Sequence, residues 1–126
     1  MSRVLIIDDS PSQLIGMKRA VEKLGHEVVT AEDGAAGVEA AKRELPDLIL
    51  MDVVMPNLNG FQATRSITRE ATTKHIPVIL VTTKDQDTDR VWGMRQGARA
   101  YITKPFSESE LADIVNQYLG SGPSAA

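Results

Sequence analysis

The sequence predicts an α/β fold in which five parallel strands form one sheet with helices on both faces. Five short apolar runs, rich in β-branched residues, are typical of buried strands. Segments of helical length separate these runs, and such alternation favours a parallel sheet covered by helices. The predicted strands are the runs at 4–7, 28–31, 48–51, 78–81 and 100–102.

The predicted helices are bounded by capping signals. Ser10 and Gln13 have the spacing of a capping box, in which each side chain bonds the backbone N–H of the other residue. Gly25 is placed to end this first helix. Ser107 and Glu110 repeat the capping-box spacing at the start of the last one. The other predicted helices cover residues 35–45, 60–70 and 86–96.

Length and composition indicate one globular domain. The chain has 126 residues, of which 42% are hydrophobic and 25% charged, so it can form a core. We expect one domain over residues 1–120 and a flexible tail over 121–126. A net charge of −3 argues against nucleic-acid binding, and the lack of cysteine excludes disulfides. No apolar run approaches the roughly 18 residues of a membrane span, so we expect a cytoplasmic protein without membrane insertion.

Polar side chains follow the predicted strands at the ends where parallel sheets bind ligands. Asp8 and Asp9 follow the first strand, and Asp52 follows the third. Thr82 ends the fourth strand, and Lys104 follows the fifth. A carboxylate directly after a core strand is costly unless it is paired. The sequence therefore predicts that these side chains gather at one edge of the sheet.

This set of side chains suits magnesium and phosphoryl chemistry. Three neighbouring carboxylates disfavour joint ionisation, and a divalent cation relieves that conflict. Oxygen ligands in an incomplete protein cage favour Mg²⁺, with Mn²⁺ as an alternative. Lys104 adds a positive charge for an anion, and Thr82 adds a hydroxyl donor. Together these groups could stabilise a phosphoryl group that is attacked by a carboxylate.

Four segments carry a resemblance to a known family. "VLIIDDS", "LILMDVVMPNLNG", "VILVTT" and "AYITKPF" resemble the receiver domains of two-component response regulators, in the same order and spacing over residues 3–119. The resemblance implies a doubly wound, flavodoxin-like (βα)5 fold with strand order 2-1-3-4-5. It also implies a phosphoryl switch that modifies itself, and not a turnover enzyme.

The resemblance assigns roles to the acidic residues and the lysine. Asp52 would be the phosphoacceptor, which attacks a phosphohistidine of a partner kinase. Asp9, Asp52 and the backbone carbonyl of Val54 would hold Mg²⁺, and Asp8 would act through a bound water. Lys104 would contact the phosphoryl oxygens.

The resemblance also implies a switch. Thr82 would move toward the phosphoryl group, and Tyr101 would follow by changing its rotamer. The peptide bond before Pro105 is expected to be cis, which only an X-Pro bond adopts at low cost.

Three positions are expected to set how long the phosphoryl group persists. Thr83 stands where receivers often have Ala or Gly, so it narrows access to the group or adds a hydroxyl beside it. Val54 and Lys84 stand where receivers that lose phosphate quickly often carry polar or acidic residues. We therefore predict slow to moderate self-dephosphorylation.

Three further segments indicate a subfamily. "VVMPNLNGFQATR", "VTTKDQ" and "VWGMRQGA" resemble the twitching-motility regulators of type IV pilus chemosensory systems. The implied partners are a histidine kinase of the CheA type and an unknown downstream protein, with the chain as a monomeric messenger or phosphate sink. A chemotaxis regulator of another pathway is the alternative.

One helix offers a candidate partner surface. Val91 and Met94 fit the buried stripe of the predicted helix 86–96, whereas Trp92 lies off that stripe. An exposed aromatic side chain can anchor a partner, so Trp92 is predicted to contact one, together with Tyr101. The alternative is that the ring of Trp92 folds over Tyr101 or a neighbouring aliphatic side chain.

Three other classes of function fit the sequence less well. Phosphatases of the haloacid-dehalogenase type also use an Asp nucleophile after a strand, but they need a second Asp where this chain has Val54. A nucleotide-binding module is disfavoured because no G-x-G-x-x-G or Walker A sequence follows a strand. A receiver that serves only as a scaffold is disfavoured because the acidic residues and Lys104 are all present.

Overall fold

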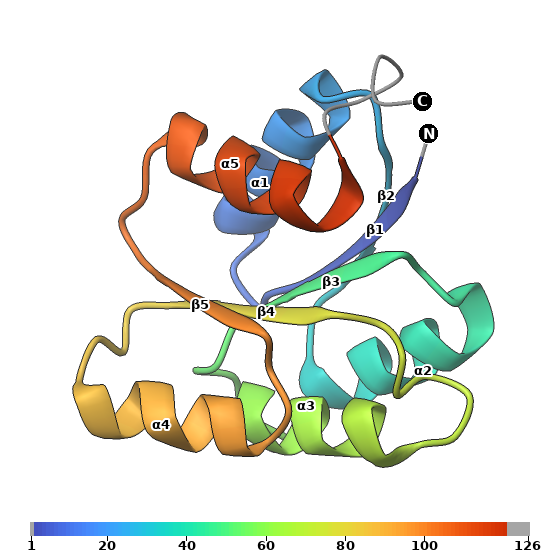
Figure 1. Ribbon diagram of the computed structural model, residues 1–126, viewed down its shortest axis with the longest axis vertical. Coiled ribbons are helices and arrows are strands. Elements are labelled where there is room, and N and C mark those ends of the chain that lie inside the picture. Colours follow the sequence, from blue (N-terminus) through green and yellow to red (C-terminus); the bar gives the residue numbers. More distant parts are fainter. Residues whose placement is uncertain (1, 121–126) are drawn as a thin grey trace.

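The structure is a computed structural model that describes residues 2–120. Five strands alternate with five helices, as the sequence predicts (Figure 1). The predicted tail over 121–126 lies outside the described residues. The elements in chain order are β1 (Arg3–Ile7), α1 (Pro11–Lys23), β2 (Glu27–Ala31), α2 (Gly34–Glu44), β3 (Leu48–Met51), α3 (Gly60–Arg69), β4 (Val78–Thr82), α4 (Asp87–Arg95), β5 (Ala100–Thr103) and α5 (Glu108–Leu119).

The five strands form one parallel sheet in the order β2-β1-β3-β4-β5, which is the doubly wound, flavodoxin-like arrangement. Helices α1 and α5 cover one face, and α2, α3 and α4 cover the other (Figure 1). Successive strand residues point to opposite faces. Accordingly, Leu5 and Ile7 pack on the side of α2 and α3, whereas Val4 and Ile6 pack on the side of α1 and α5.

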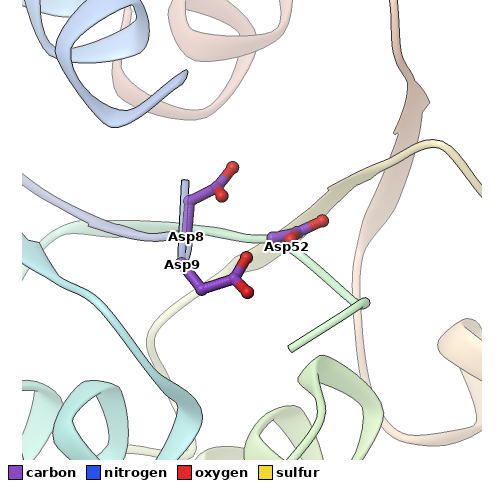
Figure 2. A group of neighbouring side chains, drawn as sticks. All are labelled: Asp8, Asp9 and Asp52. Carbon is purple, nitrogen blue, oxygen red and sulfur yellow. The ribbon is translucent and has the colours of Figure 1, made fainter. Parts of the chain in front are cut away.

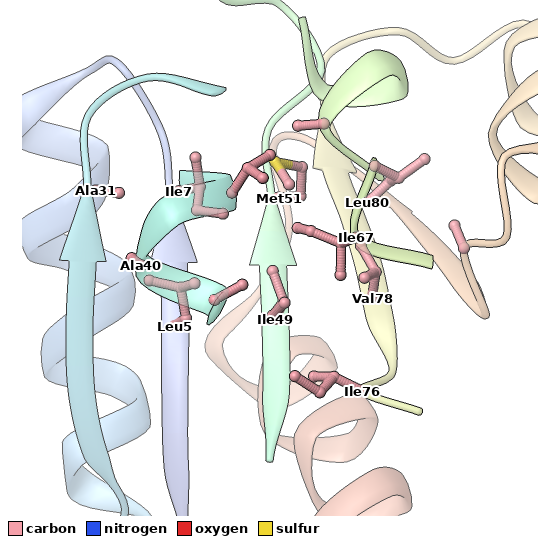
Figure 3. Close-up of a cluster of buried hydrophobic side chains, with 14 of the residues drawn as sticks. Leu5, Ile7, Ala31, Ala40, Ile49, Met51, Ile67, Ile76, Val78 and Leu80 are labelled. Atoms are coloured by element: carbon pink, nitrogen blue, oxygen red, sulfur yellow. The ribbon is translucent and has the colours of Figure 1, made fainter. Parts of the chain in front are cut away.

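Apart from Thr82 at the end of β4, the central strands β3 and β4 are apolar, because both of their faces are covered. Every residue of β3 and β4 is buried. Ile49, Met51, Val78 and Leu80 meet Ile67 of α3 in one cluster (Figure 3). Full burial of such a side chain contributes about 1.5–3 kcal/mol. This core fixes the strand ends that carry the polar residues.

Of the two predicted capping boxes, the one at the start of α5 forms, but the one at the start of α1 does not. Ser107 and Glu110 exchange side chain to backbone hydrogen bonds at the start of α5. Asn59 and Gln62 form a capping box at the start of α3, which was not predicted. The capping box predicted for Ser10 and Gln13 is wrong, since the Ser10 side chain makes no cap hydrogen bond. Instead, the backbone N–H of Ser10 donates to Asp8 Oδ1 at 2.9 Å. The Gln13 side chain is therefore free for another partner.

Helix α4 contacts the sheet differently from the prediction. Val91 and Met94 are 53% and 46% exposed, so the predicted buried stripe is wrong. The buried position of α4 is Gly93, where an added Cβ would lie 2.6 Å from the Leu80 side chain. Because the residue without a side chain faces the sheet, the apolar side chains beside it remain at the surface.

Among residues 2–120, no helix combines the length and the apolar character needed to cross a bilayer.

Candidate functional site

Sheet register brings three carboxylates together. Ile7 of β1 pairs with Met51 of β3, so the next residues, Asp8 and Asp52, leave the sheet side by side. The Asp52 N–H donates to the Ile7 carbonyl at 2.9 Å, and this hydrogen bond holds the Asp52 backbone beside the end of β1. Asp8, Asp9 and Asp52 each offer one oxygen atom, and these atoms lie within 4.8 Å of one another. Figure 2 shows the three side chains at this edge of the sheet.

The three acids differ in burial. Asp8 and Asp52 are only 1% and 7% exposed, whereas Asp9 faces solvent. Burial raises the pKa of Asp52 to about 6, because a charged carboxylate loses its hydration there. The positive charge of Lys104 opposes this shift in pKa, and the negative charges of Asp8 and Asp9 add to it.

Lys104 reaches the acids from the end of β5. Its side chain is 10% exposed, and Nζ donates to Asp8 Oδ2 at 2.7 Å. The same Nζ lies 3.6 Å from Asp52 Oδ1 and makes a second hydrogen bond, to Gln13 Oε1. The backbone N–H of Lys104 donates to the Thr82 carbonyl at 2.7 Å. The peptide bond that joins Lys104 to Pro105 is cis, as expected from the resemblance.

The end of β4 supplies the hydroxyl residues. Thr82 is fully buried, and its Oγ1 accepts a hydrogen bond from the Lys84 N–H at 3.3 Å. Thr83 and Lys84 are exposed. Lys84 Nζ lies 3.8 Å from Asp89 Oδ1, so this ammonium faces the start of α4. The structure thus brings Thr82 to the edge that carries the acids.

Tyr101 connects β5 with the β4–α4 loop. Its hydroxyl donates to the Lys84 carbonyl at 2.7 Å, and the Arg90 guanidinium lies 5.0 Å from its ring centroid. Burial raises the pKa of Tyr101 to about 12, with a further rise from Asp89 and an opposing effect of Arg90. The ring is therefore held between the loop and α4. Trp92, on the same helix, is 48% exposed.

The first residue of α3, Gly60, was not predicted from the sequence to matter for the site. A Cβ on Gly60 would overlap the carbonyl oxygen of Asp52 and approach the Val53 Cα to 2.7 Å. The Gly60 N–H donates to the Val53 carbonyl at 2.9 Å. The available signal was the Asn-Gly pair before a predicted helix. Val54, in the loop between β3 and α3, is 53% exposed.

The residues present fit a hard divalent cation. Carboxylate oxygens are the ligands that Mg²⁺ prefers, and three from two adjacent strand ends can share one ion. Such an ion would also offset the mutual repulsion that helps to raise the pKa of Asp52.

Comparison with known proteins identifies the family of this chain. The sequence pattern of the response regulator receiver domain matches residues 4–116. The chain belongs to this family. Receiver domains of this family accept phosphoryl groups from histidine kinases and act as signalling switches.

Two curated relatives differ in how much of their length the chain spans. It is 56% identical to the protein PilH of Pseudomonas aeruginosa over 119 residues, which are 94% of this chain and 98% of PilH. It is 38% identical to the response regulator PleD of Caulobacter vibrioides over 107 residues, which are 85% of this chain but only 24% of PleD.

Solved structures share the fold of this receiver domain. The chemotaxis protein CheY4 of Vibrio cholerae superposes with a TM-score of 0.89 at 29% identity, covering 94% of this chain and 98% of that one. The receiver domain of a sensor histidine kinase from Pseudomonas aeruginosa gives a TM-score of 0.87 at 32% identity, over 95% and 98% of the chains. That structure holds a magnesium ion in its active-site cleft.

Proposed function

We propose that this chain is a single-domain response regulator that accepts a phosphoryl group from a histidine kinase on Asp52. The observation that carries the proposal is the placement of Lys104 Nζ, 3.6 Å from Asp52 Oδ1 and 2.7 Å from Asp8 Oδ2. An ammonium at this distance can neutralise charge on a phosphoryl group attached to Asp52. The identity with PilH over nearly its whole length supports the single-domain reading.

In the proposed reaction, an Asp52 oxygen attacks the phosphorus of a phosphohistidine. The new O–P bond forms as the N–P bond breaks, and the imidazole leaves with its electron pair. A pKa of about 6 leaves Asp52 mostly ionised at pH 7 and therefore nucleophilic. Lys104 moves toward the phosphoryl oxygens and balances their charge.

Asp9, Asp52 and the Val54 carbonyl are proposed to hold Mg²⁺ directly, with Asp8 acting through a bound water. The ion supplies charge neutralisation for the transferred group. Mn²⁺ offers similar chemistry for oxygen ligands. The structurally similar receiver domain of the sensor histidine kinase, which holds magnesium in its active-site cleft, supports a magnesium site here.

The proposed switch runs from Thr82 to Tyr101. Phosphorylation adds roughly −1.5 to −2 charge, which attracts Lys104 and the Thr82 hydroxyl. Movement of Thr82 would disturb its hydrogen bond with the Lys84 N–H, and Lys84 also holds the Tyr101 hydroxyl through its carbonyl. Trp92 on α4 is the proposed contact for a downstream protein. Val54, Thr83 and Lys84 are proposed to set the lifetime of the phosphoryl group.

The proposed pathway is type IV pilus chemosensory signalling, with a CheA-type kinase as phosphodonor. The three sequence segments that resemble twitching-motility regulators and the 56% identity with PilH support this pathway. A regulator of this kind can act by docking to another protein or by draining phosphoryl groups from a shared kinase.

Intact-mass measurement with a small acyl phosphate tests the assignment. We expect the wild type to gain the mass of one phosphoryl group in Mg²⁺ and none in excess chelator. Asp52→Asn should gain none, whereas Asp113→Asn, which changes an exposed acid of α5, should behave as wild type. Steady hydrolysis of many phosphomonoesters would instead indicate a phosphatase.

A further inference from the structure

The Lys104 ammonium is held away from Asp52 by two other partners. Nζ donates to Asp8 Oδ2 at 2.7 Å and to Gln13 Oε1, whereas Asp52 Oδ1 lies 3.6 Å away, beyond ordinary hydrogen-bond length. An ammonium has three N–H donors, and two are used in these bonds. Because the distance to Asp52 exceeds hydrogen-bond length, Nζ has to move from this position to bond a group on Asp52.

Gln13 reaches Lys104 because the start of α1 is tied to the acidic site. Asp8 Oδ1 accepts the backbone N–H of Ser10 at 2.9 Å, while Asp8 Oδ2 accepts from Lys104. The same carboxylate thus fixes both the first turn of α1 and the ammonium. Since Gln13 takes no part in a capping box, its side-chain oxygen is available to Lys104.

We propose that Gln13 is a positioning residue that holds Lys104 in its resting place and releases it when a phosphoryl group forms on Asp52. This inference rests on the function proposed above. An amide oxygen is a weaker acceptor for an ammonium than a charged phosphoryl oxygen. The phosphoryl group therefore takes the ammonium from Gln13, and the lost hydrogen bond opposes formation of the phosphorylated state.

The proposal predicts opposite effects for two substitutions of Gln13. Gln13→Met keeps the length of the side chain but removes the acceptor, so Lys104 is released more easily. Gln13→Glu supplies a charged acceptor, so Lys104 is held more firmly. If Gln13 had only a structural role, both substitutions would change the affinity for a phosphoryl analogue in the same direction.

Calorimetric titration with beryllofluoride in saturating Mg²⁺ tests the proposal. We expect Gln13→Met to bind this phosphoryl analogue roughly threefold to tenfold more tightly than wild type, which is the effect of removing one competing hydrogen bond. Gln13→Glu should bind it more weakly. Ser12→Glu is the matched control, because it adds the same charge at an exposed neighbouring position of α1.

The outcomes separate this inference from the proposed function. Tighter binding by Gln13→Met, with Gln13→Glu weaker than Ser12→Glu, supports the proposal. Unchanged or weaker binding by Gln13→Met overturns it, as does a Gln13→Glu variant that binds no more weakly than Ser12→Glu. A wild type that fails to bind the analogue would instead remove the proposed function itself. Thermal unfolding of each variant checks that the fold is retained.

Discussion

Asp52 carries a charge that the fold disfavours. Its side chain is 7% exposed, and burial raises its pKa from an ordinary value of 3.8 to about 6. Because the folded pKa lies above the unfolded one, the protonated acid favours folding. This contribution to stability is complete below about pH 3.8 and is lost as the pH rises through about 6.

Asp52→Asn should therefore stabilise the metal-free protein at pH 7.5. The amide removes the buried charge, and a shift of this size corresponds to a gain of about 1–3 kcal/mol. Urea unfolding in chelator measures the gain, which should shrink toward zero at pH 4. An equal gain at both pH values would show that the charge of Asp52 is not its cause.

At the scale of elements, helix α2 ends in a strained residue. Leu45 follows α2 with φ 45° and ψ 60°, a left-handed conformation that a branched side chain disfavours. Leu45 is also 52% exposed, so replacing it removes little buried area.

Leu45→Asn should stabilise the protein by about 0.5–1 kcal/mol, because asparagine tolerates this conformation. Leu24 closes α1 with φ −81°, in the right-handed region, and packs against the core. Leu24→Asn is therefore the control, and it should destabilise. Denaturant unfolding compares the stability of the two variants. A Leu45→Asn variant that is no more stable than wild type would contradict the strain described at Leu45.

The start of α3 is the second place where the backbone is constrained. Gly60 lies against the backbone of Asp52 and Val53, so a methyl group there must displace the acceptor residue or the start of α3. Gly16, in contrast, lies within α1, and apart from the adjacent backbone of that helix and its chain neighbours no atom lies within 4 Å of an added Cβ.

Gly60→Ala should lower stability by about 1–3 kcal/mol and slow phosphorylation by a small acyl phosphate. Gly16→Ala is the matched control, and it should raise stability by about 0.5–1 kcal/mol. Chemical denaturation and intact-mass kinetics measure the two effects. A Gly60→Ala variant with wild-type stability and rate would contradict the close packing described here.

At the scale of the whole molecule, the sequence allowed the fold and the convergence of the acids to be predicted. Short apolar runs located β1 and β3, and parallel pairing then required Asp8 and Asp52 to leave the sheet together. Strand order 2-1-3-4-5 followed from the family resemblance and is confirmed. These features depend on patterns that span the chain and are insensitive to any single contact.

Other features depend on contacts that the sequence does not encode locally. The predicted capping box at Ser10 does not form, because the Ser10 backbone N–H donates to Asp8 and the Gln13 side chain accepts a hydrogen bond from Lys104. The burial of α4 was predicted wrongly because Gly93 is the residue that faces Leu80. Gly60 was missed because its role depends on the path of the preceding loop. In each case a tertiary contact overrides the local pattern.

Identification of the phosphorylated residue tests the role of Asp52 most directly. Hydride reduction converts an aspartyl phosphate into homoserine, which peptide mass spectrometry can locate. After incubation with a small acyl phosphate and Mg²⁺, we predict homoserine at position 52 and at no other acid. Conversion of Asp8 or Asp9 instead, or no conversion in the presence of Mg²⁺, would contradict the assignment of Asp52 as the phosphoacceptor.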